Sequence, residues 1–206
     1  RLGGGWRGMS EPAVSVVICF LDAERFLREA VAGVFAQTFA DWELLLVDDG
    51  SRDGGRAIAE EEAALRPERV RVLEHPGHEN RGISASRNLA LGEARGRFLA
   101  FLDADDIWLP EKLERQVALL EAHPEVAMTY GPTQRWYGWT GRRSDARRDL
   151  WWPTHVPSGT IVRPPDLLTP YLRTSGAARP GISSLLVRRD AAKAVGGFDD
   201  RFRGVF

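Results

Sequence analysis

Apolar positions along the chain form either continuous runs or patterns with helical spacing. The runs at 14–20, 42–47 and 98–102 are nearly uninterrupted, which is typical of strands that are covered on both faces. Between the first two runs, apolar side chains recur at helical spacing over 23–37, which predicts a helix with Asp22 as its N-cap. A strand, a helix and a second strand in this order favour parallel pairing.

The same alternation continues as far as residue 130. Further helices are predicted at 54–65, 83–94 and 110–122, and further strands at 70–73 and 126–130. The rhythm predicts an α/β fold with a Rossmann-like, mostly parallel sheet and helices on both of its faces.

Residues 131–180 break this pattern, because prolines and glycines interrupt them and no periodicity holds. An unpatterned stretch of this length indicates a functional excursion or lid, and its aromatic and basic side chains suit an acceptor that carries sugar or phosphate. The alternative is that the tryptophans pack a satellite core and the arginines are solvated. A strand at 182–187, a helix near 190–195 and a turn at Gly196 and Gly197 are predicted to follow. The aromatic and basic side chains of 131–180 on which both interpretations rest are Trp136, Trp139, Arg142, Arg143, Arg147, Arg148, Trp151 and Trp152.

Length and charge narrow the class of protein. The 206 residues suit one domain, and 28 basic against 29 acidic residues give a net charge of -1, which provides no global attraction to nucleic acid or to an anionic membrane. Any basic site must therefore be local. No apolar stretch is long enough to span a membrane, so a cytoplasmic protein is expected. The single cysteine, Cys19, lies in an apolar run and is predicted to be a buried, inert thiol.

Carboxylates gather directly after two of the predicted strands. Asp48 and Asp49 follow one strand, and Asp103, Asp105 and Asp106 follow another, so a parallel sheet would bring both groups to one edge. Like charges this close repel unless something compensates them, which points to a hard divalent cation. The alternative is two polar turns, with Asp106 helping to start the next helix.

Other phosphate-binding and metal-binding patterns are missing from the sequence. Neither a G-x-G-x-x-G motif after the first strand nor a P-loop lysine is present, so a metal-nucleotide site is favoured over a dinucleotide cofactor site. The histidines share no metal-ligand spacing and are predicted to be ordinary loop or helix-end residues: His75, His78, His123 and His155.

Several motifs in their order along the chain resemble glycosyltransferase family 2, whose members have the GT-A fold. The resemblance covers roughly residues 14–206. It implies transfer of a sugar from a nucleotide-sugar donor to an acceptor hydroxyl, with inversion at the anomeric carbon. It rests on the segments VSVVIC at 14–19, QTF at 37–39, ELLLVDDGS at 43–51, NRGISASRN at 80–88, LDADD at 102–106 and GGFD at 196–199.

The resemblance also implies roles for single residues on the donor side. Phe20, Leu21 and Asp22 correspond to the edge of the base pocket, and Asp49 to the carboxylate that reads the base. Asp48 either assists or caps its turn.

The acidic segment after the third run matches the family's D-x-D pattern of Asp103, Ala104 and Asp105. Asp105 corresponds to the direct ligand of Mg²⁺ or Mn²⁺, and Asp103 to the residue that contacts the ribose or a metal-bound water. Arg87 corresponds to a residue that approaches a phosphate or orients an acidic turn, and the alternative is a surface or ion-paired helix residue. The family's catalytic base is expected just after Phe206, which predicts a chain truncated before that residue.

These inferences combine into one expected organisation. Residues 1–12 are predicted to be a disordered extension and 13–206 an incomplete GT-A domain, with a donor-binding part at 13–130, an acceptor-side or lid region at 131–180 and a returning strand and turn at 181–206. The expected donor is a UDP-sugar. The expected acceptor is a saccharide, lipid-linked or other hydroxyl, in polysaccharide, glycolipid or cell-envelope glycan synthesis.

Two other functions remain open at this stage. The first is a nucleotide-sugar-binding module without turnover. The second is a nucleotidyltransferase, which the missing glycine-rich basic loop disfavours. Nucleic acid binding is not expected. The protein is expected to be cytoplasmic, with a peripheral position at the inner face of the membrane as a further option.

Overall fold

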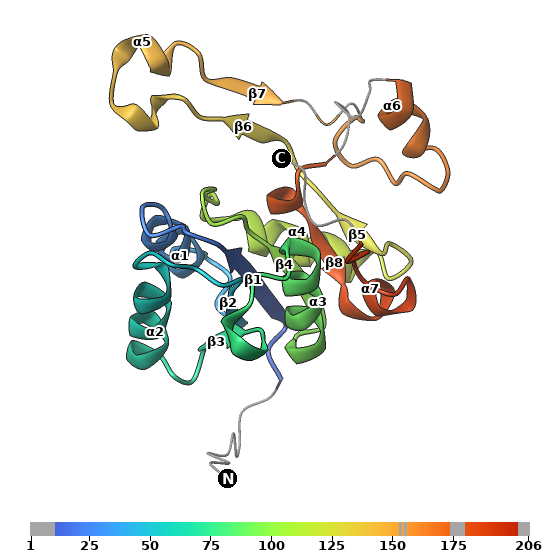
Figure 1. Cartoon of the computed structure of the whole chain (residues 1–206). Helices are drawn as coiled ribbons and strands as arrows, with labels where there is room; N and C mark the ends of the chain where they lie inside the picture. Colours follow the sequence, from blue (N-terminus) through green and yellow to red (C-terminus); the bar gives the residue numbers. More distant parts are fainter. Residues whose placement is uncertain (1–10, 153, 155, 174–179, 202–206) are drawn as a thin grey trace.

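A computed structural model describes residues 11–152, 154, 156–173 and 180–201. Six strands form one sheet in the order β3-β2-β1-β4-β8-β5 (Figure 1). The first four in this order are parallel neighbours, whereas β8 runs antiparallel to both β4 and β5. The predicted mostly parallel sheet is therefore confirmed. The strands are β1 (Val14–Phe20), β2 (Trp42–Asp48), β3 (Val70–Glu74), β4 (Phe98–Phe101), β5 (Met128–Thr129) and β8 (Leu186–Arg188).

Helices cover both faces of this sheet, as the uninterrupted apolar runs require. On β1, Val16 and Ile18 pack in the core on one face of the sheet, whereas Val17 and Cys19 pack on the other face. Burial raises the pKa of the Cys19 thiol to about 12, which agrees with the predicted inert cysteine. One face carries α1 (Leu27–Phe35), α2 (Gly55–Leu65) and α4 (Lys112–Ala122), and the other carries α3 (Ile83–Glu93) and α7 (Arg189–Ala194).

The region predicted to lack periodicity contains an antiparallel hairpin. Its strands are β6 (Thr133–Arg135) and β7 (Leu150–Trp152), and its tip holds the short helices η2 (Gly138–Thr140) and α5 (Arg143–Ala146). The hairpin projects away from the sheet and its helices, and α6 (Leu168–Arg173) follows it (Figure 1).

Several predicted boundaries are wrong. The helix predicted over 23–37 begins only at Leu27 and its N-cap is Phe26, so Asp22 does not cap it. The strand predicted over 126–130 is reduced to the two residues of β5. The strand predicted over 182–187 begins instead with a 3-10 turn, η3 (Ile182–Ser184), before β8. Residues 1–10 of the predicted disordered extension lie outside the described residues.

Candidate functional site

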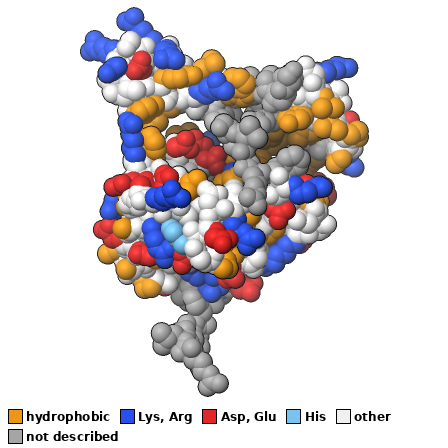
Figure 2. All heavy atoms as spheres, in the orientation of Figure 1, with side chains coloured by type: hydrophobic (Ala, Val, Ile, Leu, Met, Phe, Trp, Pro, Cys, Tyr) orange, Lys and Arg blue, Asp and Glu red, His pale blue; other side chains and the backbone are white. Residues whose placement is uncertain are grey.

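The candidate site lies at the carboxyl ends of three neighbouring strands. β1 lies between β2 and β4, and the strand order reverses here, because β2 and β3 extend to one side of β1 and β4 lies on the other. Such a reversal in an open α/β sheet leaves a crevice in which ligands bind. The turns that hold Asp22, Asp49 and Asp103 therefore meet at one edge. Figure 2 shows acidic side chains in the hollow between this edge and the hairpin.

The Asp49 carboxylate is held by backbone N–H groups at the start of α3. Its Oδ1 accepts a hydrogen bond from Arg81 N at 2.8 Å, and Gly82 N donates to both carboxylate oxygens, at 3.2 and 3.0 Å. Gly82 is the N-cap of α3, where the helix dipole also favours negative charge. Each carboxylate oxygen can accept a further hydrogen bond. Asp49 is thus fixed in orientation and retains capacity for a ligand.

His75 is a loop residue, as predicted, and it is buried beside Asp49. Its Nε2 lies 2.9 Å from the Ser86 hydroxyl and 3.6 Å from Asp49 Oδ1. Gly50 also restrains this turn: it has a φ of +86°, and a Cβ there would lie 2.9 Å from the backbone nitrogen of Asn80. The loop before α3 therefore packs directly on the acidic turn after β2.

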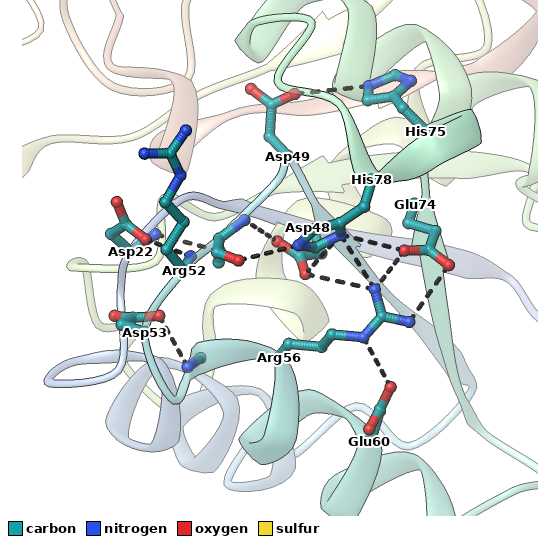
Figure 3. Close-up of polar contacts among 12 residues, drawn as sticks. Asp22, Asp48, Asp49, Arg52, Asp53, Arg56, Glu60, Glu74, His75 and His78 are labelled. Atoms are coloured by element: carbon teal, nitrogen blue, oxygen red, sulfur yellow. Dashed lines mark hydrogen bonds and ion pairs between the residues drawn. The ribbon is translucent and has the colours of Figure 1, made fainter.

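Asp48 caps its own turn, which is one of the two roles predicted for it. Its Oδ1 accepts from Ser51 N at 2.9 Å, and its buried Oδ2 has no hydrogen-bond partner. Two cationic groups lie close to Oδ2, Arg56 Nη1 at 4.0 Å and His78 Nδ1 at 3.8 Å (Figure 3). Asp48 is therefore a buried structural carboxylate with basic neighbours.

His78 ends the 3-10 helix η1 (Pro76–His78), which agrees with its prediction as a loop or helix-end residue, and it joins this cluster to β3. Its Nε2 lies 2.9 Å from the Ser51 carbonyl oxygen, and its Nδ1 lies 3.2 Å from Glu74 Oε2 (Figure 3). The hydrogen bond with the Ser51 carbonyl, and then the Glu74 carboxylate, raise the pKa of His78 above its usual value. Arg56 pairs with Glu74 and lowers the pKa of that carboxyl.

The end of β1 is connected to the turn after β2. Asp22 has a φ of +50°, its backbone N donates to Ser51 Oγ at 3.1 Å, and its Oδ1 accepts from Arg52 N at 2.7 Å. Phe20 is buried and Leu21 is 46% exposed. The residues predicted to form the edge of the base pocket thus lie next to the Asp48-Asp49 turn.

Asp103 pairs with Arg87 across the gap between β4 and α3. Arg87 Nη2 donates to Asp103 Oδ1 at 3.0 Å, so Arg87 is an ion-paired helix residue whose partner lies in an acidic turn. Burial raises the pKa of Asp103, while Arg87 opposes the rise. Ala104 is buried. Asp105 is exposed and makes no hydrogen bond or ion pair with any described residue.

Ser183 supports the turn at 103–106, here called the D-x-D turn, through hydrogen bonds to both of its ends. The sequence did not predict this role of Ser183. Its hydroxyl accepts from Asp103 N at 3.0 Å and donates to Asp106 Oδ2 at 2.5 Å. Its carbonyl oxygen accepts from Trp108 Nε1 at 2.7 Å. Asp106 is therefore tied to η3 rather than to the start of α4, whose N-cap is Glu111. Burial raises the pKa of Asp106, although the Ser183 hydroxyl opposes this.

The D-x-D turn suits an open cation site. Among the described residues, no three His, Cys, Asp or Glu side chains converge to enclose a metal ion. Mg²⁺ often takes only one or two protein carboxylates and completes its shell with substrate phosphates and water. Asp105 is free and Asp103 is 42% exposed, so this pair of oxygen donors fits such a site.

A second contact links α3 to the Gly-Gly-Phe-Asp turn. Asn88 Nδ2 donates to the Phe198 carbonyl oxygen at 2.7 Å, and Phe198 N donates back to Asn88 Oδ1 at 2.8 Å. The Phe198 ring packs edge-on against Phe101 of β4, with ring centroids 5.2 Å apart. Gly197 has a φ of +75°, and a Cβ there would lie 2.5 Å from Asn88 Oδ1. The turn after α7 is therefore fitted closely to α3.

A cavity of about 480 Å³ lies between the loop after β1 and the hairpin tip. None of the residues predicted for the donor or the metal lines it, whereas Trp139 and Arg142 come from the region predicted to face the acceptor. Its walls are formed by Arg25, Phe26, Glu29, Trp139, Thr140 and Arg142.

The described helices include none that is both long and apolar enough to cross a membrane.

A parallel sheet with acidic turns at its carboxyl edge and an antiparallel strand beside β4 defines a GT-A fold. A mannosyltransferase from Pyrobaculum calidifontis, solved in complex with GDP-Man and Mn2+, has this fold: the TM-score is 0.63 at 21% identity, over 93% of this chain and 48% of that one. The model for Glycosyl transferase family 2 matches residues 15–180, and the chain belongs to that family.

Two bacterial relatives show how the match is distributed. The chain is 36% identical over 123 residues to the Escherichia coli enzyme UDP-Glc:alpha-D-GlcNAc-diphosphoundecaprenol beta-1,3-glucosyltransferase WfgD, which is 60% of this chain and 46% of that protein. It is 34% identical over 196 residues to the O-antigen biosynthesis protein RfbC of Myxococcus xanthus, which is 94% of this chain and 14% of that protein. The chain thus spans less than half the length of each relative.

Proposed function

We propose that the protein transfers a sugar from a nucleoside diphosphate sugar, a UDP-sugar, to a hydroxyl of a saccharide or lipid-linked acceptor, with inversion and with Mg²⁺ or Mn²⁺. The observation that carries the proposal is the placement of Asp49 and Asp103 on either side of the end of β1, each already oriented by α3. The names of WfgD and RfbC support a place in envelope glycan synthesis. The proposed location is the cytoplasm, at the inner face of the membrane.

In this proposal the end of β1 and the turn after β2 receive the nucleoside. Phe20, Leu21 and Asp22 form the edge of the base pocket, and Asp49 accepts a hydrogen bond from the base. Because Arg81 and Gly82 hold the carboxylate, little conformational entropy is lost when the base binds.

The D-x-D turn receives the rest of the donor. Asp105, with Asp103, holds the cation; Asp103 also contacts the ribose, and Ala104 packs beneath the turn. The bound cation would neutralise charge that develops on the departing nucleoside diphosphate. Arg87 holds Asp103 in place and opposes the rise that burial causes in the pKa of this carboxyl. The acceptor hydroxyl also needs a general base, which we assign to no described residue.

Calorimetry with UDP and with GDP, in the presence of Mn²⁺ or EDTA, tests the donor site. We expect tighter binding of UDP, and a loss of at least about tenfold on adding EDTA or on replacing Asp105→Asn. Asp41→Asn is the matched control, because Asp41 is exposed just before β2, at the opposite end of that strand. UDP binding that neither EDTA nor Asp105→Asn changes would overturn the metal site. UDP binding without any sugar transfer would favour the binding-module alternative.

A further inference from the structure

The hairpin, residues 133–152, exposes an unusual share of the chain's large apolar side chains. Trp136 and Trp139 are 47% exposed, and Leu150 and Trp151 are 54% exposed. Four of the seven tryptophans of the protein lie in these twenty residues. Large exposed apolar surface on a projecting element usually marks an interaction site. The exposed apolar side chains therefore indicate that the hairpin binds a partner.

The hairpin is also the basic part of the protein. It holds five arginines and two aspartates, a net of +3, so the remaining residues carry -4 of the overall -1. Arg143 and Arg147 are exposed and make no side-chain hydrogen bond or ion pair with the described residues. Figure 2 shows blue and orange side chains next to each other on this arm. A polyanionic surface would be attracted to the hairpin and repelled by the rest of the molecule.

Aromatic rings and guanidinium groups are stacked along the hairpin. The Arg135 guanidinium lies 4.6 Å from the Trp152 ring centroid, and the Arg148 guanidinium lies 4.3 Å from the Tyr137 centroid. Tryptophan and tyrosine favour the boundary between hydrocarbon and water, and arginine can bury its stem there while its charge stays among headgroup phosphates. A protein partner would instead have to desolvate several arginines, which is costly without matching carboxylates.

We propose that the hairpin docks on an anionic lipid bilayer, with its tryptophans at the headgroup boundary and its arginines against lipid phosphates. This inference rests on the proposed function, which places the protein at the inner face of the membrane, and deepens it by naming the surface that binds there; that surface contains no residue assigned to the donor site. The hairpin lies beyond the edge of the sheet at which β1 ends (Figure 1). The guanidinium group of Arg25, in the loop that follows β1, lies 4.7 Å from the ring centroid of Trp139 in the hairpin. Docking would bring the donor site close to acceptors held in the membrane.

Vesicle flotation tests this surface directly. We expect the protein to float with vesicles made from equal parts of phosphatidylcholine and phosphatidylglycerol, and to stay unbound with phosphatidylcholine alone. Arg143→Gln together with Arg147→Gln should weaken partition roughly thirtyfold, from about one kcal/mol per basic residue. Trp136→Ser together with Trp151→Ser should also weaken it, and should reduce the blue shift of tryptophan emission that vesicles cause. Arg115→Gln, at an exposed site on α4, should bind as the wild type does.

Three results would overturn the docking surface: equal binding to both vesicle types, binding unchanged in both double variants, or hairpin-dependent self-association that vesicles do not affect. Thermal unfolding identifies any variant that fails to fold. The hairpin variants should bind UDP with the affinity of the wild type in calorimetry. Loss of vesicle binding and loss of UDP binding are therefore measured separately, and an error in the docking surface can be told apart from an error in the donor site.

Discussion

The hydroxyl of Ser183 lies 2.5 Å from a carboxylate oxygen of Asp106, although 77 positions separate the two residues. The same hydroxyl accepts the N–H of Asp103. One side chain from η3 therefore fixes both ends of the D-x-D turn, and the segment that follows the 131–180 region supports the candidate cation site.

Replacing Ser183→Ala should lower the free energy of unfolding by about 1–3 kcal/mol, because the Asp103 N–H and the Asp106 carboxylate lose their partner. It should also weaken Mn²⁺-dependent UDP binding. Ser184→Ala is the matched control, since the Ser184 hydroxyl donates within its own turn, to the Gly181 carbonyl at 2.7 Å. Urea denaturation and calorimetry measure the two effects. Loss of UDP affinity to the same extent in both variants would contradict the role of Ser183.

Arg87→Gln should shift the pH dependence of donor binding. Arg87 is the group that lowers the pKa of Asp103 against the effect of burial, so its removal should raise that pKa further. Because the cation requires an ionised Asp103, binding is lost as pH falls through the Asp103 pKa, and the loss should begin at a higher pH in the variant. UDP calorimetry with Mn²⁺ over a pH series, with Arg115→Gln as control, measures the midpoint. An unchanged midpoint would contradict the proposed coupling.

His78 should make stability depend on pH near neutrality. Its folded pKa is raised, so its stabilising contribution is fully present below about pH 6.5, the usual value, and is lost as pH rises through the folded pKa. His78→Gln cannot titrate and should lose this part of the decline in melting temperature. His123→Gln, at the exposed end of α4, should retain the wild-type profile. Identical profiles for the wild type and His78→Gln would argue against this assignment.

Asn88→Ala should destabilise the fold by about 1–3 kcal/mol, because the half-buried backbone N–H and carbonyl of Phe198 lose both hydrogen bonds. Asn80→Ala should change stability by less than about 0.5 kcal/mol, since that exposed side chain makes no hydrogen bond with a described residue. Chemical denaturation of the two variants provides the comparison. A similar small change in both would show that the turn around Phe198 adds little stability.

The central strands and the acidic turns could be predicted from the sequence because their signals are local. β1 and β2 are uninterrupted apolar runs, each followed by a polar turn, and parallel strands bring such turns to one edge. The sequence left open whether Arg87 approaches a phosphate, orients an acidic turn or is a surface or ion-paired helix residue, since spacing alone could not identify its partner.

Other features depend on partners that are distant in sequence. Asp22 has the local signal of an N-cap, yet its carboxylate binds the backbone of Arg52, which lies 30 residues away. The segment 182–187 has the apolar content of a strand, but Ser183 turns toward the D-x-D segment and delays the strand until Leu186. The hairpin was missed because its strands have three residues each and no alternation.

Consecutive residues of α3 serve two different turns, since Arg87 holds Asp103 and Asn88 holds Phe198. An α-helix advances about 100° per residue, so inserting one residue between Gly82 and Arg87 would rotate both side chains away from their partners together. The number of residues between the N-cap of α3 and these two side chains therefore determines the direction in which each one points. That direction in turn fixes the contacts with the turn at Asp103 and with the turn at Phe198. Length variation among relatives should therefore be excluded between Gly82 and Asn88.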